Sequence, residues 1–211
     1  MSTGKQPLIT LDTITEQVSA TLEVRRSLFI TYLAPVQNKE SALQYLETLR
    51  KKHWDAAHHC YAWRLGHLGQ DYRLADDGEP AGTAGKPILF VLQQGNFTNI
   101  IAVTVRYFGG VKLGKGPLAR AYADSVRESV SMVTRLPVVD QENIVVHCLY
   151  DDVSRVIPLL EEVQAEFSTE YSDSVRFHVQ IAKPKLEYLV TELTTRTNAR
   201  AGYSKISTKG E

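Results

Sequence analysis

A glycine-rich, positively charged junction at residues 106–122 constrains this chain more than any other segment. It reads Arg-Tyr-Phe-Gly-Gly-Val-Lys-Leu-Gly-Lys-Gly-Pro-Leu-Ala-Arg-Ala-Tyr and joins an apolar, β-like run at 99–105 to a helix-like run at 118–133. Glycine lets backbone N–H groups approach a ligand closely, and the start of a helix carries partial positive charge. The junction therefore predicts a strand-to-helix turn that binds an anion: a phosphate, a nucleic-acid backbone or an acidic partner surface.

The candidate anion-binding residues of the junction are Arg106, Tyr107, Gly109, Gly110, Lys112, Lys115 and Arg120. The cations would contact phosphates, and Tyr107 or Phe108 would stack on a base. Because alternate residues of a strand point to opposite faces, we expect only one of these two rings at the surface.

The junction matches the spacing of a nucleotide-binding phosphate loop but lacks one of its parts. Gly109-x-x-x-x-Gly114-Lys115 stands between a strand and a helix, whereas Gly116 replaces the Ser or Thr whose hydroxyl coordinates magnesium in that motif. Nucleotide hydrolysis would lose part of its machinery without that hydroxyl. The pattern argues against a nucleotide-hydrolysing enzyme and leaves a phosphate-binding loop without that activity open.

Length and charge together predict two domains. A chain of 211 residues accommodates one large domain or two small ones. Residues 1–136 carry 16 Lys and Arg against 12 Asp and Glu, whereas the remainder carries 8 against 12. We place the boundary at the change of charge beside Pro137, which gives domains at 1–137 and 138–211.

The composition is typical of a soluble cytoplasmic protein. No apolar stretch approaches the roughly 20 residues that span a bilayer, and residues 1–11 lack the pattern of a signal peptide. Two cysteines, Cys60 and Cys148, do not make a disulfide framework. We expect no cofactor, metal or membrane partner, and the sequence does not indicate the oligomeric state.

Local patterns alternate between strands and helices and predict an α+β fold. In the first domain, we expect strands at 21–33, 58–65 and 99–105, and helices at 39–52 (with Asn38 as N-cap), from Lys86 to Gly95, and at 118–133. In the second, we expect strands at 143–150, 166–171, 175–182 and 201–207, and helices at 153–165 and 185–195. That β-α-β-β-α-β order fits a ferredoxin-like sandwich. Its carboxylates at Asp151, Asp152, Glu161 and Glu162 are expected at helix N-termini and in solvent.

The triplet His58-His59-Cys60 is a second candidate site. Strand alternation puts His58 and Cys60 on one face and turns His59 away. Two ligands do not complete a zinc site, and neighbouring strand residues rarely meet in attack geometry. A packed strand with polar residues near a cleft is the favoured interpretation, with His58 or His59 as candidate acid or base.

The loop that follows is a third candidate site. Asp76, Asp77, Gly78 and Glu79 bring three carboxylates into four residues, which suits a hard cation such as magnesium but is also a common turn composition. The turn is the favoured interpretation. Gly82, Thr83, Gly85 and Lys86 form a second glycine-rich helix entry, for which close packing and anion binding are both open.

Three ordered motifs identify the chain as resembling the Impact family. They are His-His-Cys-x-Ala-Trp at 58–63, Asp-Asp-Gly-Glu-Pro-x-Gly-Thr-Ala-Gly-x-Pro at 76–87, and Arg-Tyr-x-Gly-Gly-x-x-Leu-Gly-x-Gly at 106–116. The layout resembles that of bacterial two-domain members over essentially the whole chain. Two positions depart from the pattern: Ala75 replaces a usual Ser, and Pro117 replaces a second glycine. Pro117 is expected at the first helical position, where it removes one N–H donor.

The resemblance implies a fold and a field of function. The family's N-terminal domain is an α/β sandwich similar to the second domain of ribosomal protein S5 and to domain IV of elongation factor G, and its C-terminal domain is ferredoxin-like. Eukaryotic members regulate translation by competing for the activator of an amino-acid-starvation kinase, a partner that does not carry over to bacteria. No catalytic residue of the family is transferable to this sequence.

The favoured hypothesis is a translation-associated binding protein that contacts RNA or the ribosome through the junction. One alternative is an enzyme acting on a small phosphorylated or peptide-like substrate, with a metal held by Asp76, Asp77 and Glu79. It requires the carboxylates to lie within roughly 10 Å of the histidines, close enough to meet in one cleft. The other alternative is an interaction module for an acidic protein. Exposed cations at 106–120 would favour the RNA-binding hypothesis. Pairing of Lys112 and Lys115 with the carboxylates of Asp76, Asp77 and Glu79 would weaken that hypothesis.

Overall fold

The computed structural model describes residues 11–206, and the chain forms two compact units, Met1–Val138 and Val139–Glu211. The predicted absence of a signal peptide concerns residues 1–11, of which 1–10 lie outside the described residues, as does residue 207 at the end of the last predicted strand. Each unit combines helices with antiparallel strands, so the predicted α+β class is confirmed.

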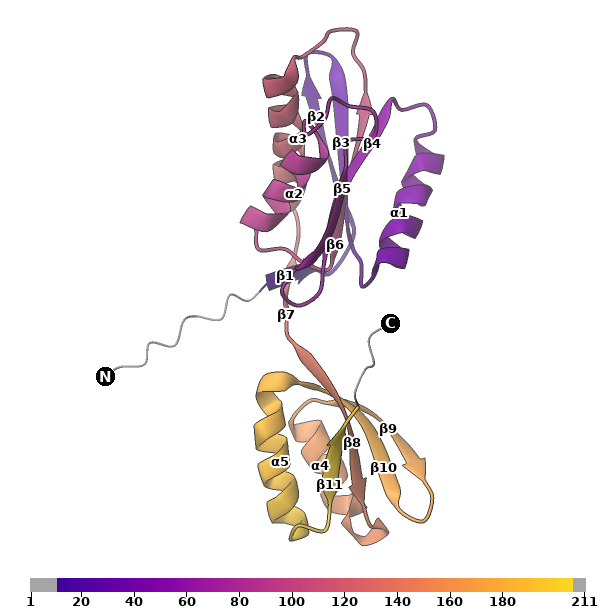
Figure 1. The fold of residues 1–211 in the computed structure, drawn as a ribbon, viewed down its shortest axis with the longest axis vertical. Helices are drawn as coiled ribbons and strands as arrows, with labels where there is room; N and C mark the ends of the chain where they lie inside the picture. The colour runs from indigo at the N-terminus through magenta and orange to yellow at the C-terminus, as the bar shows by residue number, and fades with distance from the viewer. Residues whose placement is uncertain (1–10, 207–211) are drawn as a thin grey trace, which may run out of the picture. The chain divides into compact units, whose positions relative to one another are not determined.

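A five-stranded antiparallel sheet forms the centre of the N-terminal unit (Figure 1). Its strands, in spatial order, are β2 (Val18–Val24), β3 (Ser27–Pro35), β6 (Ile100–Tyr107), β4 (His58–Leu65) and β5 (Asp71–Ala75). Every neighbouring pair is antiparallel. The edge strand β5 was not predicted from the sequence, and most of its residues are exposed.

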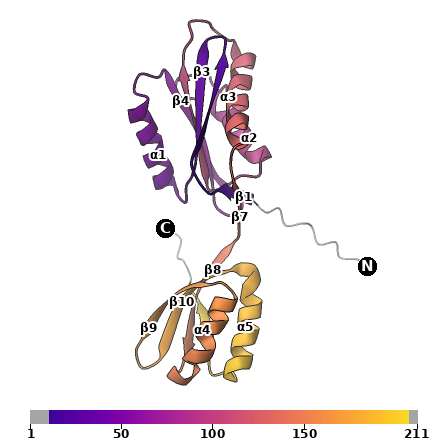
Figure 2. The same ribbon diagram turned by 180° about the vertical axis from the view of Figure 1, so that it is seen from behind.

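Helices cover both faces of this sheet (Figures 1 and 2). Helix α1 (Lys39–Lys52) lies on one face, and α2 (Gly85–Gln94) and α3 (Lys115–Val130) lie on the other. The predicted N-cap is confirmed, because the side chain of Asn38 accepts a hydrogen bond from Ser41 N at 2.8 Å. Strand β4 is therefore buried on both sides: Cys60 packs toward α2 and α3, and Trp63 packs toward α1.

The single β-like run expected at 21–33 is in fact a hairpin. Strands β2 and β3 are joined by a two-residue turn at Arg25 and Arg26, whose φ angles are 47° and 67°. A two-residue turn with two positive φ angles suits the right-handed twist of a hairpin. The prediction missed it because such turns normally carry Asn or Gly, and two arginines give no turn signal.

The helix predicted at 118–133 begins earlier, at Lys115. Pro117 is therefore the third helical residue rather than the first. Proline fits there because the N–H groups of a first helical turn have no intrahelical partner. The expectation that Pro117 removes one N–H donor from the helix start is unaffected.

Antiparallel register brings four connections to one end of the sheet, the upper end of this unit in Figure 1. They are the 25–26 turn and the loops at 53–57, 76–84 and 108–114. We call this set the loop end. Helices α2 and α3 both start there, and the three sequence motifs converge on it.

Two short strands lie near the opposite end of the sheet. Strands β1 (Leu11–Ile14) and β7 (Arg135–Val138) pair with each other, and neither was predicted. Arg135 packs over the Phe97 ring at 4.3 Å and donates to Asp12. These contacts hold β1, near the start of the unit, against β7 at its end.

The C-terminal unit contains the elements β8 (Gln141–Cys148), α4 (Val153–Glu162), β9 (Glu166–Tyr171), β10 (Val175–Ala182), α5 (Lys183–Thr197) and β11 (Gly202–Lys205). This is the β-α-β-β-α-β order that the sequence predicts, with strands in the spatial order β11-β8-β10-β9. Apolar residues of the sheet and of both helices form its core.

One residue of this unit contradicts the sequence prediction. Asp152 is fully buried instead of solvated, and its carboxylate accepts from Arg200 Nη2 at 2.6 Å and from Arg155 Nη1 at 3.1 Å. Arg200 lies 48 residues away, so no local pattern reveals the pair. Within residues 11–206, no helix is long and apolar enough to cross a membrane.

Replacing Gly109 tests how tightly the 108–114 loop packs on the hairpin. A Cβ atom at Gly109 would lie 2.1 Å from the carbonyl carbon of Arg26 and 2.4 Å from Ser27 N. Because both are backbone atoms, we expect Gly109→Ala to lower the free energy of unfolding by about 1–3 kcal/mol, as overpacking does. Gly116→Ala is the control, since nothing lies within 4 Å of a Cβ there. Urea denaturation of both variants measures the difference, and equal stabilities would contradict the packing role.

Candidate functional site

A buried ion pair joins the second and third motifs. The carboxylate of Glu79 accepts from Arg106 Nη1 at 2.6 Å and from the Tyr122 hydroxyl at 2.7 Å. The two charged side chains are only 4% and 6% exposed. A buried pair of this kind requires good geometry and further hydrogen bonds to offset desolvation. Tyr122 supplies one, and Ser27 Oγ lies 3.3 Å from Arg106 Nη2.

The first motif joins the same network. The Cys60 Sγ atom lies 2.9 Å from the Asp76 carbonyl oxygen and 3.2 Å from the Tyr122 hydroxyl. His58 Nδ1 donates to the Asp77 carbonyl oxygen at 2.8 Å, which leaves Nε2 3.8 Å from Glu79 Oε2. Burial raises the pKa of both Cys60 and Tyr122, so the thiol and the phenol stay protonated.

Asp76 caps the start of α2 from a distance in the sequence. Its two carboxylate oxygens accept from the backbone N–H groups of Gly82 at 2.8 Å, Ala84 at 3.0 Å and Gly85 at 2.9 Å. Burial alone would raise the pKa of Asp76, but these three donors outweigh it and lower the pKa. The positive end of α2 therefore has an internal anion.

The second glycine-rich helix entry serves packing. A Cβ at Gly85 would lie 2.9 Å from Ala75 N, so only glycine lets the helix approach β5 this closely. Thr83 is buried and donates its hydroxyl hydrogen to the Pro80 carbonyl oxygen at 2.6 Å. Gly82 has a φ of 74°, and Lys86 is exposed. Of the two readings left open, the geometry favours close packing.

Asp77 is also engaged by the protein. Its Oδ2 accepts from the His59 backbone N–H at 2.7 Å, and its Oδ1 lies 3.4 Å from Arg50 Nη2. Its φ of 44° and the φ of 87° at Gly78 form the turn predicted for this loop. The loop thus positions its carboxylates toward protein donors.

These contacts bear on the enzyme hypothesis. The required proximity exists, since His58 and Glu79 are 3.8 Å apart. However, each of the three carboxylates already accepts hydrogen bonds from protein donors. Among residues 11–206, no group of three or more His, Cys, Asp or Glu side chains could hold a metal ion. The cluster is best explained as a network that holds the three motifs together.

The other histidine faces the α1 side of the sheet, as alternation predicts. His59 is buried, and its Nε2 has no hydrogen-bond partner in the described structure. Nearby, His53 bridges the hydroxyls of Tyr32 at 2.8 Å and Tyr107 at 2.9 Å. Burial lowers the pKa of His53 and His59, which favours neutral rings packed beneath α1.

Two residues of the third motif have other roles than phosphate or base contact. Arg106 is 5% exposed and paired with Glu79, so its guanidinium is not presented at the surface. Tyr107 bonds through its hydroxyl to His53 and Asp55. Phe108 is 52% exposed, in line with the expectation that only one of the two rings reaches the surface.

Glycines shape the 108–114 loop in two ways. Gly109 is a packing glycine against the hairpin, whereas Gly110 and Gly114 have φ angles of 84° and 83° and face open space. Leu113 is buried and anchors the loop in the core beside α3. The remainder of the loop is exposed.

The remaining cations of the motif lie at the surface. Lys112, Lys115 and Arg120 are exposed, and none forms an ion pair with any residue that the structure describes. In particular, neither lysine pairs with Asp76, Asp77 or Glu79 among the described contacts. Helix α3 has no side-chain cap and no acid in its first turn.

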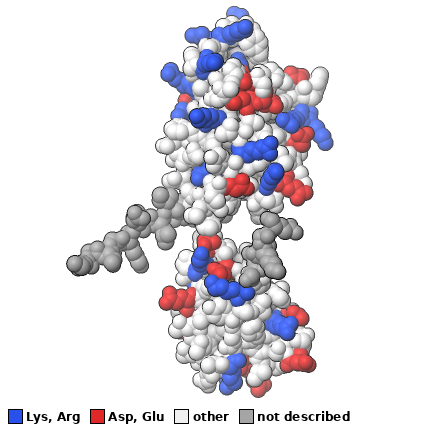
Figure 3. All heavy atoms as spheres, viewed as in Figure 1, with Lys and Arg blue, Asp and Glu red and all other residues white. Residues whose placement is uncertain are grey.

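Two further cations join them that the sequence analysis did not select. Arg25 and Arg26 are exposed, and the backbone of Arg26 packs on Gly109. Figure 3 shows Lys and Arg side chains gathered at the loop end, with carboxylates on the neighbouring surface. No periodicity links positions 25–26 to 106–120, so only the β3–β6 pairing reveals their proximity.

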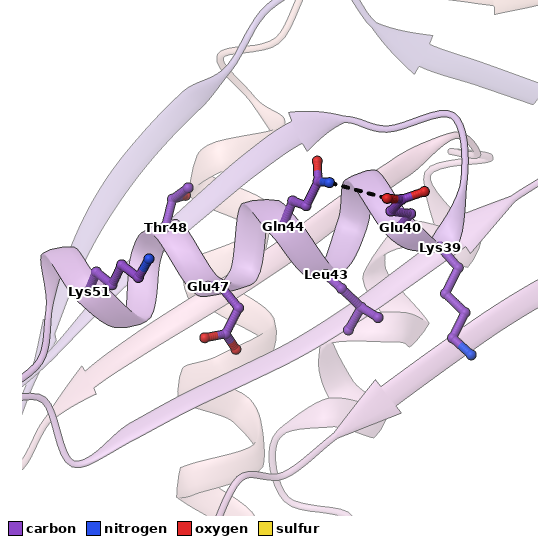
Figure 4. Close-up of a pocket in the computed structure, with 7 residues that line it drawn as sticks. All are labelled: Lys39, Glu40, Leu43, Gln44, Glu47, Thr48 and Lys51. Atoms are coloured by element: carbon purple, nitrogen blue, oxygen red, sulfur yellow. Dashed lines mark hydrogen bonds between the residues drawn. The ribbon is translucent and has the colours of Figure 1, made fainter.

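A hollow on the outer face of α1 does not belong to this site (Figure 4). Its lining residues all come from one helix: Lys39, Glu40, Leu43, Gln44, Glu47, Thr48 and Lys51. Gln44 and Glu40 contact each other across one turn at 3.5 Å. The surface mixes both charges and brings no groups from separate elements together.

Comparisons with known proteins agree with these motifs. A family model described as the Impact N-terminal domain matches residues 25–130. An "IMPACT family member" of Haemophilus influenzae is 34% identical over 84% of this chain and 88% of its own length. The Escherichia coli protein "IMPACT family member YigZ" is 35% identical over 80% and 84%, respectively. A solved structure titled as that of a hypothetical protein matches with a TM-score of 0.75 and 30% identity, covering 95% of this chain and 98% of the other.

Removing one charge of the buried pair tests whether the network holds the fold. Glu79→Gln leaves Arg106 buried without its counter-ion, so we expect a loss of about 3–5 kcal/mol in the free energy of unfolding. Glu47→Gln is the matched control, because Glu47 pairs with Arg50 at the surface and its side chain is 55% exposed. The control should cost less than about 1 kcal/mol. Similar losses in both variants, measured by urea denaturation, would contradict the role of the network.

Proposed function

Because the chain belongs to the Impact family, we propose that it is a translation-associated binding protein that contacts RNA or the ribosome through the cations of its loop end. The contacting residues are Arg25, Arg26, Lys112, Lys115 and Arg120. A cytoplasmic location, which the composition predicts, gives such a protein access to ribosomes.

The difference between two helix starts carries this proposal. Helices α2 and α3 both begin at the loop end, and each start carries partial positive charge. At α2, the carboxylate of Asp76 satisfies three backbone donors. At α3, the first turn holds Lys115, no acid and no side-chain cap. Cations at a helix start are unfavourable for the fold, so an external anion best explains them.

The hairpin tip supports the same conclusion. A residue other than glycine in the left-handed region costs roughly 1–2 kcal/mol, and both Arg25 and Arg26 adopt it. Residues held in unfavourable conformations cluster at functional sites. Two arginines at a turn that favours Asn-Gly indicate that their charges serve binding.

The shape of the surface favours a large polyanion over a small phosphate. The cations are exposed and come from separate elements, so they suit successive phosphates of a nucleic-acid backbone. Pro117 supplies no N–H to the start of α3, which limits backbone donors for one enclosed phosphate.

Two alternatives have weaker support. An enzyme would need free functional groups, but Glu79, Asp76 and Asp77 are engaged by protein donors. An acidic protein would contact the same cations, so the chemistry of the site alone does not separate it from RNA. Pull-down with and without nuclease treatment separates the two, because only an RNA-mediated complex is lost.

Reversing two of the charges tests the proposal. Lys112→Glu/Lys115→Glu removes two phosphate contacts and adds repulsion, so we expect binding to RNA and to ribosomes to fall at least tenfold. The logarithm of the binding constant should also depend less steeply on salt, by about 1.4 in slope for two contacts to a single strand. Fluorescence anisotropy with a salt titration and co-sedimentation with ribosomes measure both effects.

Lys39→Glu is the control for a lysine charge reversal away from the loop end. Lys39 opens α1, which begins near the end of the sheet opposite the loop end. It should bind as the unaltered protein does. Equal binding by the double variant, or binding that does not respond to salt, would rule the proposal out.

Replacing the hairpin tip should move stability and binding in opposite directions. Arg25→Asn/Arg26→Gly supplies the residues that this turn favours. Because the change relieves the cost of the left-handed backbone at these positions, we expect thermal denaturation to show a fold more stable by about 1 kcal/mol. The same variant should bind RNA less tightly because two cations are lost. Arg25→Lys/Arg26→Lys keeps the charges and should keep the binding. If the Asn-Gly variant binds RNA with unchanged affinity, the hairpin tip is not part of the binding surface.

A further inference from the structure

We infer that the loop end binds its RNA as a single strand, with the exposed rings of Trp54 and Phe108 stacking on unpaired bases. This inference rests on the proposed function and names the class of RNA that the site accepts. It adds Trp54, which belongs to none of the three motifs.

Trp54 is unusually exposed for a large aromatic residue. It lies in the 53–57 loop that follows α1, and it is 83% exposed. The loop itself is fixed: Ala57 N donates to the Arg106 carbonyl oxygen at 3.0 Å, and Asp55 accepts from the Tyr107 hydroxyl at 3.1 Å. An exposed indole on an ordered loop can stack on a base while the loop backbone loses little conformational entropy.

Phe108 is the second exposed ring, and it follows the end of strand β6, which the Trp54 loop also contacts through Tyr107. It directly follows Tyr107, the last residue of β6, and it is 52% exposed. The guanidinium of Arg106 lies 5.6 Å from the centre of its ring. A cation on the protein side of the ring leaves the outer face available to a base.

Cations accompany both rings. Lys51 and Lys52 end α1 immediately before the Trp54 loop, and both are exposed. On the Phe108 side, the backbone of Arg26 packs on Gly109, the residue after Phe108, and Lys112 follows in the same loop. The acid closest in sequence to Trp54 is Asp55, which is engaged by Tyr107. Bases stacked on the two rings would bring the phosphates that join them close to these cations.

Stacking requires an unpaired base. A duplex hides its base faces within the stack, so its recognition rests on phosphates, hydroxyls and groove edges. Single-stranded nucleic acid combines exposed base faces with a continuous charged backbone, which aromatic rings and cations recognise together. Two exposed rings among cations therefore favour a single strand over a duplex.

Trp54 provides its own readout, because the chain has only two tryptophans and Trp63 is 1% exposed. We would titrate the full chain with an oligouridine of about twelve nucleotides and with an RNA duplex of equal length. The single strand should quench the fluorescence of Trp54 and bind more tightly than the duplex. Trp54→Leu should lose the quenching and weaken single-strand binding about tenfold, the effect of one stacked base, with little change for the duplex.

Tyr72→Leu is the control, because Tyr72 is 54% exposed but lies on β5 away from the loop end. It should bind as the unaltered protein does. If Trp54 fluorescence does not respond, or if Trp54→Leu binds both RNAs like the unaltered protein, the stacking inference is wrong. Salt-dependent binding that Lys112→Glu/Lys115→Glu abolishes would then still support the proposed function. If neither RNA binds, the proposed function and this inference both fail.

Discussion

The buried pair between Glu79 and Arg106 is the interaction on which the loop end depends. It connects the 76–84 loop to strand β6 at a distance of 2.6 Å, and both side chains are almost completely shielded from solvent. Tyr122 extends the same connection to α3. Without this pair, a buried arginine would lack its counter-ion, and three elements that carry the motifs would lose their common contact. The buried contacts of Glu79 thus position the elements that carry the exposed cations.

The charges of the motifs thus divide into two groups. The carboxylates of the second motif face inward, where Asp76 caps α2 and Glu79 neutralises Arg106. The remaining cations face outward without a carboxylate partner among the described residues. This division explains why a nearly neutral composition can coexist with a locally positive surface. In the near-match to a phosphate loop, the first glycine has a packing role, because Gly109 lies against the backbone of the hairpin.

The sequence predicted elements whose signals are local. Helix α1 is signalled by its N-cap and by apolar residues at helical spacing, and alternation assigns the residues of β4 to two faces. That both faces of β4 are buried follows only from the helices that cover the sheet. The roles of Arg106 and Asp152 could not be predicted, because their partners lie 27 and 48 residues away along the chain. Arg25 and Arg26 were missed for a related reason. Arginine is unusual in a turn with two positive φ angles, and only the pairing of β3 with β6 brings these residues close to the third motif. Membership of a motif indicated which residues lie close together in the fold, but it did not indicate which of their side chains are exposed.

A surface of this kind links binding to stability. Lys115, in the first turn of α3, opposes the dipole of that helix, and the hairpin arginines adopt an unfavourable backbone conformation. Both effects raise the free energy of the unbound protein. A phosphate backbone at the loop end would offset the first directly, because it supplies the negative charge that Asp76 supplies at α2. Binding to the folded state alone also stabilises it by mass action. The same residues that weaken the isolated fold would therefore contribute most when the polyanion is bound, which is the behaviour expected of a site maintained for its ligand.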